Sequence, residues 1–434
     1  MSRGGPKAII DAAPMGSAQW VAVLVTVGLN ALDGFDVLSI SFASPGIAHD
    51  WGIDKGTLGW VLSMELFGMA AGSLFLGGVA DKVGRRPTIL GCLVAMAAGM
   101  FAAARSHGVA ELLPWRLLTG LGIGGTLAAI NALAAESTNR RWRSFAMALM
   151  VIGYPLGGVI GGLCVQRILA GGTWHAVFDA GGWATAAFVP LVWLLVPESV
   201  AFLDRRRAPG ALEQLNRILA RFGHPPAEAL SDPGPEGMRH SITDVLRPGL
   251  LATTLLVTFA YFAHITSFYF MVKWVPKIVV DMGFDPKTAA GMLTWVSLGG
   301  AVGGALFGLI ATRVALKTLT LVTLLAGAVM IVRFGHGAAD LSHLELTLAC
   351  SGLFTNAAIA GFYLLFAQVF PTHVRATGTG FAIGVGRGGA VMAPVIAGYL
   401  FEAGLPLQTV AWIMACGSLL AAAALLMLRV RDGD

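Results

Sequence analysis

Two aspartates lie inside the first long apolar run of the chain. The run extends from about Trp20 to Ala43 and contains Asn30, Asp33 and Asp36. It is long enough to cross a hydrocarbon layer of roughly 30 Å, and an ionised aspartate at its centre costs on the order of 2.5 to 3.5 kcal/mol on insertion scales. A chain that keeps two of them is expected to use them, facing a cavity lined by protein or water.

The spacing of these carboxylates predicts proton binding. Residues three apart share one face of a helix, with Cβ atoms roughly 5 to 6 Å apart, so Asp33 and Asp36 are neighbours and Asn30 extends their stripe. Repulsion and poor solvation raise the proton affinity of at least one of the pair. An alternative stays open, in which Gly34 breaks the helix and the aspartates cap the break or pair with a buried arginine.

Arg387 is a second charged residue expected near the middle of the membrane. It lies among four glycines between positions 384 and 389, and small neighbours let helices approach closely and leave room for a ligand. A guanidinium can hold a carboxylate through two hydrogen bonds. Arg387 could instead form a static ion pair with Asp33 or Asp36. The two roles combine if it releases an aspartate for protonation when another carboxylate binds.

Other polar and aromatic side chains in the apolar runs complete a candidate binding set. Rings can stack on a planar ligand, although each ring taken singly is more often packing or lipid-facing. His264 could carry a proton or be a buried, satisfied histidine, and Glu65 could pair with Arg116 or line an outer vestibule. The predicted binding residues are Arg387, Asn30, Tyr154, Tyr261, His264, Tyr269, Trp295, Asn356, Phe362 and Tyr363.

The composition is that of an integral membrane protein. Of 434 residues, 56% are hydrophobic and 12% are charged, against about 25% charged in a typical soluble domain. Residues 1–17 lack the apolar core and cleavage site of a signal peptide, so the first run is expected to remain as a span. Twelve spans are predicted, near 19–43, 57–80, 88–104, 110–135, 145–170, 176–196, 249–275, 288–311, 316–333, 344–369, 376–401 and 408–428.

The basic residues predict the orientation. With both termini in the cytoplasm, roughly 20 Lys and Arg fall on the cytoplasmic side, about 7 outside and about two inside spans, which agrees with the positive-inside rule. The formal charge of +5 then reflects topology, and no nucleic-acid partner is expected. The four cysteines are isolated, so neither a disulfide nor a metal site is indicated.

A polar interval divides the spans six and six. Residues 1–200 are predicted as an N-terminal six-helix bundle, 201–247 as a cytoplasmic linker and 248–434 as a C-terminal bundle. Within the linker, the amphipathic segment 211–222 could lie on the inner membrane surface or be a plain linker helix. The segments 72–86 and 303–317 align, with Gly77 over Gly308, so the two halves are expected to be related around a central site.

Two motifs place charged residues at the ends of the predicted spans. The first, Gly77-x-x-x-Asp81-Lys-x-Gly-Arg85-Arg86, connects the second and third spans, and the second, Arg116-x-x-x-Gly-x-Gly-x-Gly, lies in the fourth. The first resembles the signature loop of the major facilitator superfamily, and the second resembles another motif of that superfamily. This resemblance implies an all-α fold of twelve transmembrane helices in two six-helix bundles related by pseudo-twofold symmetry.

Two shorter motifs suggest a subgroup. Asp33-Gly-Phe-Asp36 and Gly-Val-Gly-Arg387-Gly-Gly are similar to those of the aromatic acid:proton symporters, the group of the 4-hydroxybenzoate transporters. The resemblance implies proton-driven import of an aromatic carboxylate by alternating access. We expect a functional monomer in the inner membrane, with Asp33 and Asp36 as the proton-coupling residues and the proton in place of any cofactor. Alternative hypotheses are that the protein carries another organic acid, that it is an exporter, or that it is a sensor that does not transport. An enzyme is disfavoured because no nucleophile and base constellation is visible.

The resemblance also implies a latch at the cytoplasmic side. Asp81 could meet the positive start of the eleventh span, and Arg85 and Arg143 could pair with Glu136. The alternative is that these arginines serve topology alone. The predicted gating residues are Gly77, Asp81, Arg85, Arg86, Arg116, Glu136, Arg143 and Arg375.

Overall fold

Twelve long apolar helices make up most of the molecule. The computed structural model describes residues 5–231, 245–337, 340–371 and 374–428, and it contains no strand within them. Every predicted span is present as a helix long and apolar enough to cross a membrane. The spans are α2 (Ser17–Trp51), α3 (Lys55–Val83), α4 (Arg85–Ala103), α5 (Val109–Ser137), α6 (Arg143–Leu169), α7 (Trp174–Leu195), α11 (Pro248–Asp281), α12 (Pro286–Ile310), α13 (Leu316–Gly335), α14 (Leu341–Val369), α15 (Arg375–Glu402) and α16 (Leu407–Met427).

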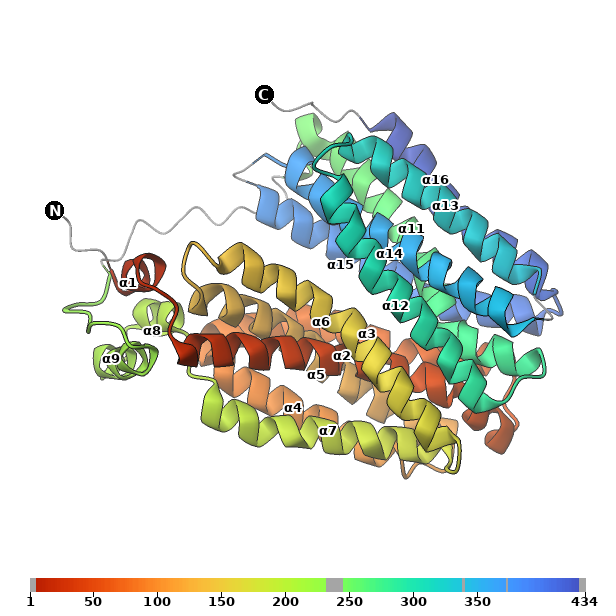
Figure 1. Cartoon of the computed structure of the whole chain (residues 1–434), viewed down its shortest axis with the longest axis horizontal. Coiled ribbons are helices and arrows are strands. Elements are labelled where there is room, and N and C mark those ends of the chain that lie inside the picture. Colours follow the sequence, from red (N-terminus) through yellow and green to blue (C-terminus); the bar gives the residue numbers. More distant parts are fainter. Residues whose placement is uncertain (1–4, 232–244, 338–339, 372–373, 429–434) are drawn as a thin grey trace.

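The helices form two groups of six. In Figure 1, α2 to α7 lie in the lower half and α11 to α16 in the upper half, and the halves diverge toward the left. Three short helices, α1 (Pro6–Ala12), α8 (Val200–Arg206) and α9 (Ala211–Phe222), lie at the left end of the first half. We call this the linker end, and we call the opposite end, which carries the turns from α2 to α3 and from α11 to α12, the distal end.

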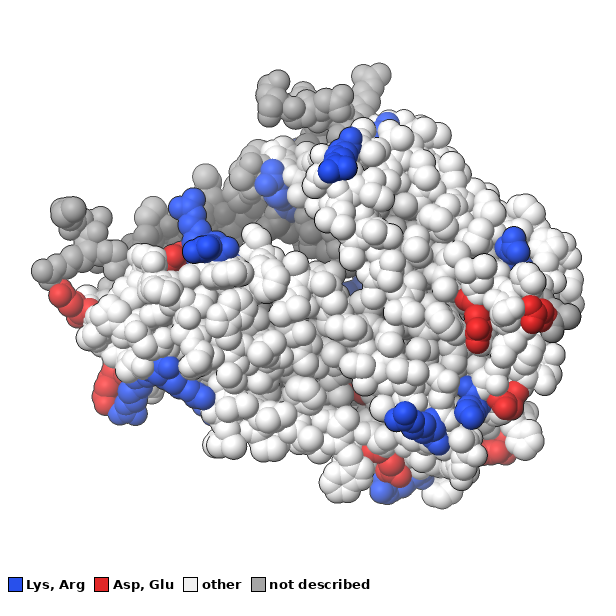
Figure 2. Space-filling view, viewed as in Figure 1, with Lys and Arg blue, Asp and Glu red and all other residues white. Residues whose placement is uncertain are grey.

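Charged side chains gather at the two ends of the molecule. Figure 2 shows a broad band between the ends that carries almost no Lys, Arg, Asp or Glu, and its face is indented between the two halves. A surface of this kind suits contact with lipid, because an exposed charge in the hydrocarbon layer is costly. The protein is therefore a multi-pass membrane protein, as the composition predicts.

Helix α2 runs unbroken through the Asn30 to Asp36 stretch. The alternative in which Gly34 breaks the helix is therefore wrong, and the glycine serves close packing instead: a Cβ there would lie 2.1 Å from the carbonyl oxygen of Tyr154 in α6. At Gly157 in α6, a Cβ would lie 1.7 Å from the carbonyl oxygen of Ala31. Small residues thus hold α2 against α6 along the stretch that carries the aspartates.

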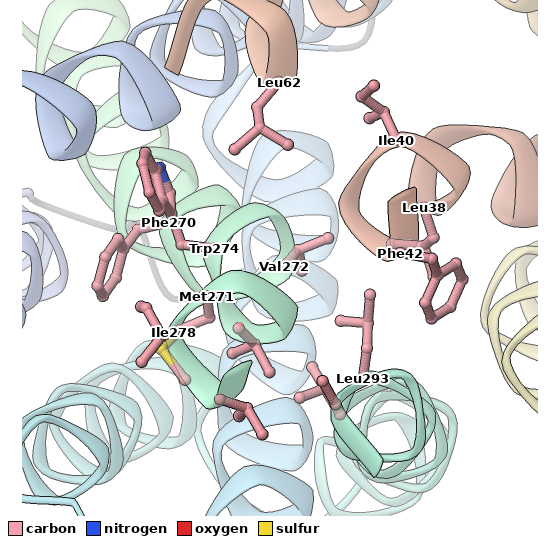
Figure 3. Packing of buried hydrophobic residues seen from close by; sticks show 14 of the residues in the cluster. Leu38, Ile40, Phe42, Leu62, Phe270, Met271, Val272, Trp274, Ile278 and Leu293 are labelled. Carbon is pink, nitrogen blue, oxygen red and sulfur yellow. The ribbon is translucent and has the colours of Figure 1, made fainter. Parts of the chain in front are cut away.

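An apolar cluster joins the two halves at the distal end. Figure 3 shows side chains of α2 and α3 facing those of α11 and α12, among them Phe42, Leu62, Trp274 and Leu293. These four side chains are at most 3% exposed. Their burial ties the halves together at this end, where each fully buried large side chain contributes about 1.5 to 3 kcal/mol.

Polar contacts between the spans of the two halves follow the same pattern. Toward the distal end, Trp60 Nε1 donates to Tyr399 Oη at 3.1 Å, and Lys55 Nζ lies 3.1 Å from Asp281. Also toward the distal end, Gln166 Nε2 donates to Thr294 Oγ1 at 3.3 Å, and nearer the middle Arg387 Nη1 donates to the Met69 carbonyl at 3.0 Å. Among the described residues, no such contact joins the spans of the two halves nearer the linker end. The halves are therefore joined from the middle to the distal end.

The amphipathic segment of the linker packs inside protein. Leu215, Leu219 and Phe222 of α9 are at most 3% exposed and form a small cluster with Ile10 of α1 and Phe202 of α8. The alternative in which this segment lies on the membrane surface is therefore wrong, because its apolar face already has a partner. A segment that is amphipathic by sequence cannot show which apolar surface its face will meet.

His224 makes the docking of α9 sensitive to pH. Its Nε2 lies 3.0 Å from Oε1 of Gln19, whose amide nitrogen donates to the Ser137 carbonyl at 2.8 Å. Burial lowers the pKa of His224 below its ordinary value of 6.5. The undocked, solvated histidine therefore binds a proton more readily, so docking is favoured above about pH 6.5 and weakens as the pH falls below it.

We expect hydrogen exchange in residues 211–222, corrected for the intrinsic chemical rate, to be faster at pH 5.5 than at pH 7.5. His224→Gln should remove this difference, since glutamine does not titrate in that range. Equal protection of wild-type α9 at the two pH values would contradict the prediction.

Candidate functional site

The two aspartates of α2 are fully buried. Both oxygens of the Asp33 carboxyl group lack a hydrogen-bond partner among the described residues, and so does Oδ1 of Asp36. Asp36 Oδ2 accepts a long hydrogen bond of 3.5 Å from Thr185 Oγ1 of α7. Asp33 therefore has no hydrogen-bond partner among the described residues, although Asp36, Cys92 and Tyr154 lie close enough to interact with it electrostatically. A buried carboxylate without a partner is expensive, so this group calls for a functional explanation.

A buried cluster of three charges lies beside these aspartates. Nη2 of Arg116 in α5 lies 2.5 Å from Oε1 of Glu65 in α3, and Nζ of Lys273 in α11 lies 3.6 Å from Oε2 of the same carboxylate. All three side chains are 0% exposed. Arg116 also donates to the main-chain oxygen of Asp36 at 3.3 Å. The predicted pairing of Glu65 with Arg116 is confirmed, whereas a role for Lys273 was not predicted.

Arg387 crosses from α15 to α3 of the other half. Its Nη1 donates to the Met69 carbonyl at 3.0 Å and to Ser73 Oγ. Among the described residues it forms no ion pair, so the alternative pairing with Asp33 or Asp36 is absent from this conformation. Both of these bonds are made by Nη1. Nε and Nη2, which have no partner among the described residues, can therefore donate to a carboxylate ligand.

Aromatic side chains lie around Arg387. A Cβ on Gly386 would meet the ring of Tyr261 at 2.2 Å, so this glycine makes room for a side chain of α11. The Tyr261 hydroxyl lies 3.3 Å from that of Tyr363 in α14, and the hydroxyls of Tyr154 and Tyr269 bring α6 and α11 together. Four of the predicted binding residues thus come from three helices around the middle of the molecule.

Several other predicted binding residues have structural partners. Both ring nitrogens of His264 lie 3.0 Å from partners in the second half, Ser418 Oγ and the Thr355 carbonyl. His264 is fully buried and stacks on Phe362, which is also 0% exposed. The proposed proton-carrying role of His264 is therefore not supported, because neither nitrogen is free and the ring lies within the second half.

Three further candidates are also accounted for by packing or exposure. The side-chain amide of Asn30 donates to the Met150 carbonyl of α6, and that of Asn356 donates to the Gly352 carbonyl at 3.0 Å. A Cβ on Gly300 of α12 would lie 2.5 Å from the Asn356 amide nitrogen. Trp295 is 38% exposed. The Asn30 bond ties α2 to α6, whereas the Asn356 bond lies within α14. A ligand role for these three residues stays a prediction.

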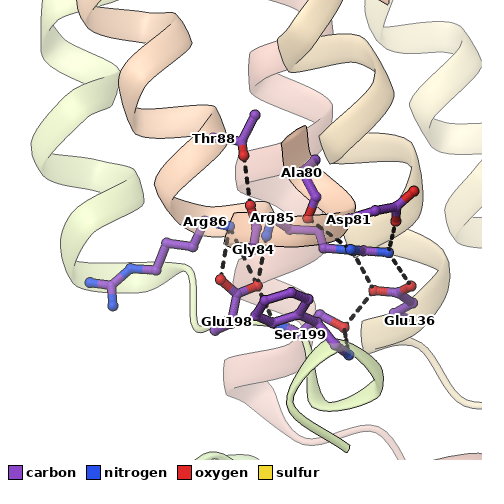
Figure 4. A network of polar contacts seen from close by, with 10 residues as sticks. Ala80, Asp81, Gly84, Arg85, Arg86, Thr88, Glu136, Glu198 and Ser199 are labelled. Atoms are coloured by element: carbon purple, nitrogen blue, oxygen red, sulfur yellow. Dashed lines mark hydrogen bonds and ion pairs between the residues drawn. The ribbon is translucent and has the colours of Figure 1, made fainter. Parts of the chain in front are cut away.

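A dense polar network occupies the linker end of the first half (Figure 4). Arg85 is 5% exposed, with its Nη2 2.9 Å from Asp81 and its Nε 3.2 Å from Glu136. Glu198 accepts hydrogen bonds from the main-chain nitrogens of Arg85 at 3.0 Å and of Ser199 at 2.8 Å. Because the start of α4 presents unpaired N–H groups and a positive dipole, a carboxylate is stabilised there.

The predicted latch residues divide between this network and other contacts. Arg143 pairs with Asp11 of α1 and not with Glu136, so that predicted pairing is wrong, whereas the predicted pairing of Arg85 with Glu136 is confirmed. Asp81 is 62% exposed, and among the described residues it makes no contact with the start of α15. Arg375 Nε donates to the nearby Phe370 carbonyl at 3.3 Å. Arg86 donates to the Trp193 carbonyl, and a Cβ on Gly77 would meet only Ala128 at an ordinary 3.6 Å.

The fold and both motifs agree with a comparison of the sequence with known families. The model of the family described as Major Facilitator Superfamily matches residues 26–344. The chain belongs to the major facilitator superfamily. The gallate transporter of Pseudomonas putida is 29% identical over 96% of this chain and 93% of its own length. The 4-hydroxybenzoate transporter PcaK of Acinetobacter baylyi is 30% identical over 89% of this chain and 85% of its own length.

Solved structures show the same superfamily fold. The structure titled D-xylose-proton symporter aligns with a TM-score of 0.74 and 15% identity over 96% of this chain and 99% of its own. A partially occluded, inward-open form of the xylose transporter XylE from E. coli aligns with a TM-score of 0.73 and 16% identity over the same shares. At these identities the likeness concerns the fold alone.

The roles of Lys273 and Glu198 in this superfamily member were not predicted, although the sequence marks each residue by a local pattern. Lys273 interrupts the apolar run of α11, and an ionisable residue inside a membrane helix is a functional candidate by default. The predicted span 249–275 contains Lys273 two residues from its end. Glu198 belongs to a short Pro-Glu-Ser motif, which gives no hint of its acceptor role at the start of α4.

We expect Glu198→Ala to destabilise the superfamily member by about 1 to 3 kcal/mol, the cost of leaving partly buried donors unsatisfied. Burial raises the pKa of the Glu198 carboxyl above its ordinary value of 4.5, against the lowering effect of the N–H groups of Ser199, Arg85 and Arg86. Thermal unfolding in detergent measures the loss. Glu213→Ala, which removes an exposed carboxylate paired with Arg217, is the matched control and should change stability by less than about 0.5 kcal/mol. Equal melting temperatures for the two variants would contradict the role of Glu198.

Proposed function

We propose that the protein is a proton-coupled symporter that imports an aromatic carboxylate by alternating access. The observation that carries this proposal is Asp33, a fully buried carboxyl group without a partner among the described residues. In such a place the neutral, protonated form avoids the cost of an unpaired buried charge. A carboxyl group that is stable only with its proton in one conformation couples that conformation to proton binding.

The substrate class is inferred from Arg387 and its aromatic neighbours. Nε and Nη2 of Arg387 suit a carboxylate, and the rings of Tyr261 and Tyr363 suit a planar body. Relatives named for gallate and 4-hydroxybenzoate transport support an aromatic acid. A carrier of another organic acid stays the alternative and is an outcome of the test below.

The orientation follows from charge. The linker end carries the arginine runs 140–141 and 205–207, and such clusters favour the cytoplasmic side. Because the halves are joined from the middle to the distal end, this conformation would then open toward the cytoplasm. Both termini would lie on the cytoplasmic side, and the membrane would be the inner membrane.

The proposal is tested with purified protein in lipid vesicles. Labelled 4-hydroxybenzoate should accumulate when an inward pH gradient is imposed, and hydroxylated and methoxylated benzoates should compete. Competition by aliphatic acids alone would move the assignment to another class of carboxylate carrier. Absence of both gradient-driven uptake and counterflow for the whole panel would overturn the proposal.

We expect Arg387→Lys to raise the KM for the acid by about tenfold or more, because an ammonium ion cannot reproduce the two-pronged geometry of a guanidinium. The packing of α15 against α3 should be kept, because lysine retains a donor for the Met69 carbonyl. KM measured by initial uptake rates decides. Wild-type affinity in Arg387→Lys would exclude the two-pronged role, and Arg333→Lys, at the exposed distal end of α13, is the control.

A further inference from the structure

Lys273 is a buried cation held entirely by the opposite half of the molecule. It belongs to α11, while its Nζ donates to the Val37 carbonyl of α2 and lies 3.6 Å from Glu65 of α3. Its side chain is 0% exposed. Lysine is almost never buried to this degree without such partners. Among the described residues, the other ion pair between the spans of the halves, Lys55 with Asp281, is 41% and 35% exposed.

Glu65 would stay paired without Lys273, whereas Lys273 would lose its partners without Glu65 and Val37. Glu65 has a second cation in its own half, Arg116, at 2.5 Å. If α11 moved away from α2 and α3, Glu65 would keep this ion pair. Lys273 would lose both acceptors, and an ammonium ion left without partners in a low-dielectric site is unfavourable. An opening at the distal end therefore exposes a cation that needs an anion.

The inference rests on the proposed function. We propose that Lys273 is a substrate-binding residue of the state that is open at the distal end, where its ammonium group receives the carboxylate of the incoming acid. When that end closes, Glu65 and the Val37 carbonyl take the place of the carboxylate on Lys273. The acid is thereby released toward the middle of the molecule, where Nε and Nη2 of Arg387 have no partner among the described residues.

The simpler account of the same contacts is a latch, in which the pair of Lys273 and Glu65 only holds the distal end shut. The two accounts predict opposite changes in the KM for substrate that arrives at the distal end when Lys273 is replaced. Removal of a latch favours the open distal end, which lowers the apparent KM for substrate arriving there. Removal of a carboxylate-binding cation raises that KM, by about ten- to a hundredfold for the loss of one charge-assisted hydrogen bond.

The test compares the two faces of the transporter. In vesicles with protein of one known orientation, initial rates of labelled 4-hydroxybenzoate transport give KM from the distal face and KM from the linker face. We expect Lys273→Met to raise the distal KM about tenfold or more and the linker-face KM less than about twofold. Lys273→Gln, which keeps a donor for the Val37 carbonyl, should behave alike and guards against a folding defect in Lys273→Met. Lys277→Met is the matched control, because Lys277 lies one turn away and pairs with Asp281.

A distal KM that stays unchanged or falls in both Lys273 variants would overturn the inference and leave the proposed function intact. Failure of the wild-type protein to transport the acid would instead remove the proposed function. A rise in KM on both faces by similar factors would also overturn the inference, since it would place Lys273 in a site shared by both states.

Discussion

Asp33→Asn is expected to abolish accumulation of the acid against its gradient while leaving exchange of acid across the membrane intact. For one proton carried with one anion, a pH difference of one unit sustains up to about tenfold accumulation. Asparagine is neutral at every pH, so it resembles the protonated carboxyl group and cannot release a proton. Because the Asp33 carboxyl lacks a partner among the described residues, the substitution removes no hydrogen bond and the fold should tolerate it.

The measurement is the final ratio of inside to outside label under an imposed pH gradient, with counterflow measured in parallel. Asp179→Asn, at an exposed aspartate that pairs with Arg105 near the distal end, should accumulate the acid like the wild type. About tenfold accumulation by Asp33→Asn would transfer the coupling role to Asp36, whose carboxyl has Thr185 beside it. Loss of counterflow as well would indicate a binding or folding defect.

Arg116→Met is expected to cause the largest loss of stability, about 3 to 5 kcal/mol. Removing one partner of a buried ion pair leaves an uncompensated charge, and Glu65 would then retain only Lys273, at 3.6 Å. Arg116 also packs over the ring of Phe178, 5.1 Å from its centroid, and donates to Ser39 Oγ at 3.2 Å. Thermal unfolding in detergent should show a large fall in melting temperature.

A second substitution separates the effect of charge from that of packing. Arg116→Met combined with Glu65→Gln removes the unpaired carboxylate, so the double variant should lose clearly less stability than Arg116→Met alone. Arg105→Met, at a pair that is 65% and 40% exposed, should change stability by less than about 1 kcal/mol. If Arg116→Met unfolded no earlier than Arg105→Met, the buried pair would contribute little.

The order and type of the elements follow from the sequence alone. Each membrane helix is a local apolar run whose length matches the bilayer, so twelve spans are predicted without knowledge of their neighbours. The same holds for the signature loop between α3 and α4, because its residues are adjacent in the chain. Asp33, Asp36 and Arg387 stand out for a similar reason, since a charge inside an apolar run is visible without a structure.

Only the tertiary structure decides which of these charges are paired. Lys273 lies 236 residues from Val37, and no local pattern links it to Glu65 or shows that α11 continues to Asp281. Arg387 turns to the backbone of α3 and leaves Asp33 alone, while His264 and the apolar face of α9 are satisfied by neighbouring helices. The free-energy cost of burying a charged residue can be inferred from the apolar run in which it lies. Whether that cost is offset depends on side chains that packing brings from distant segments.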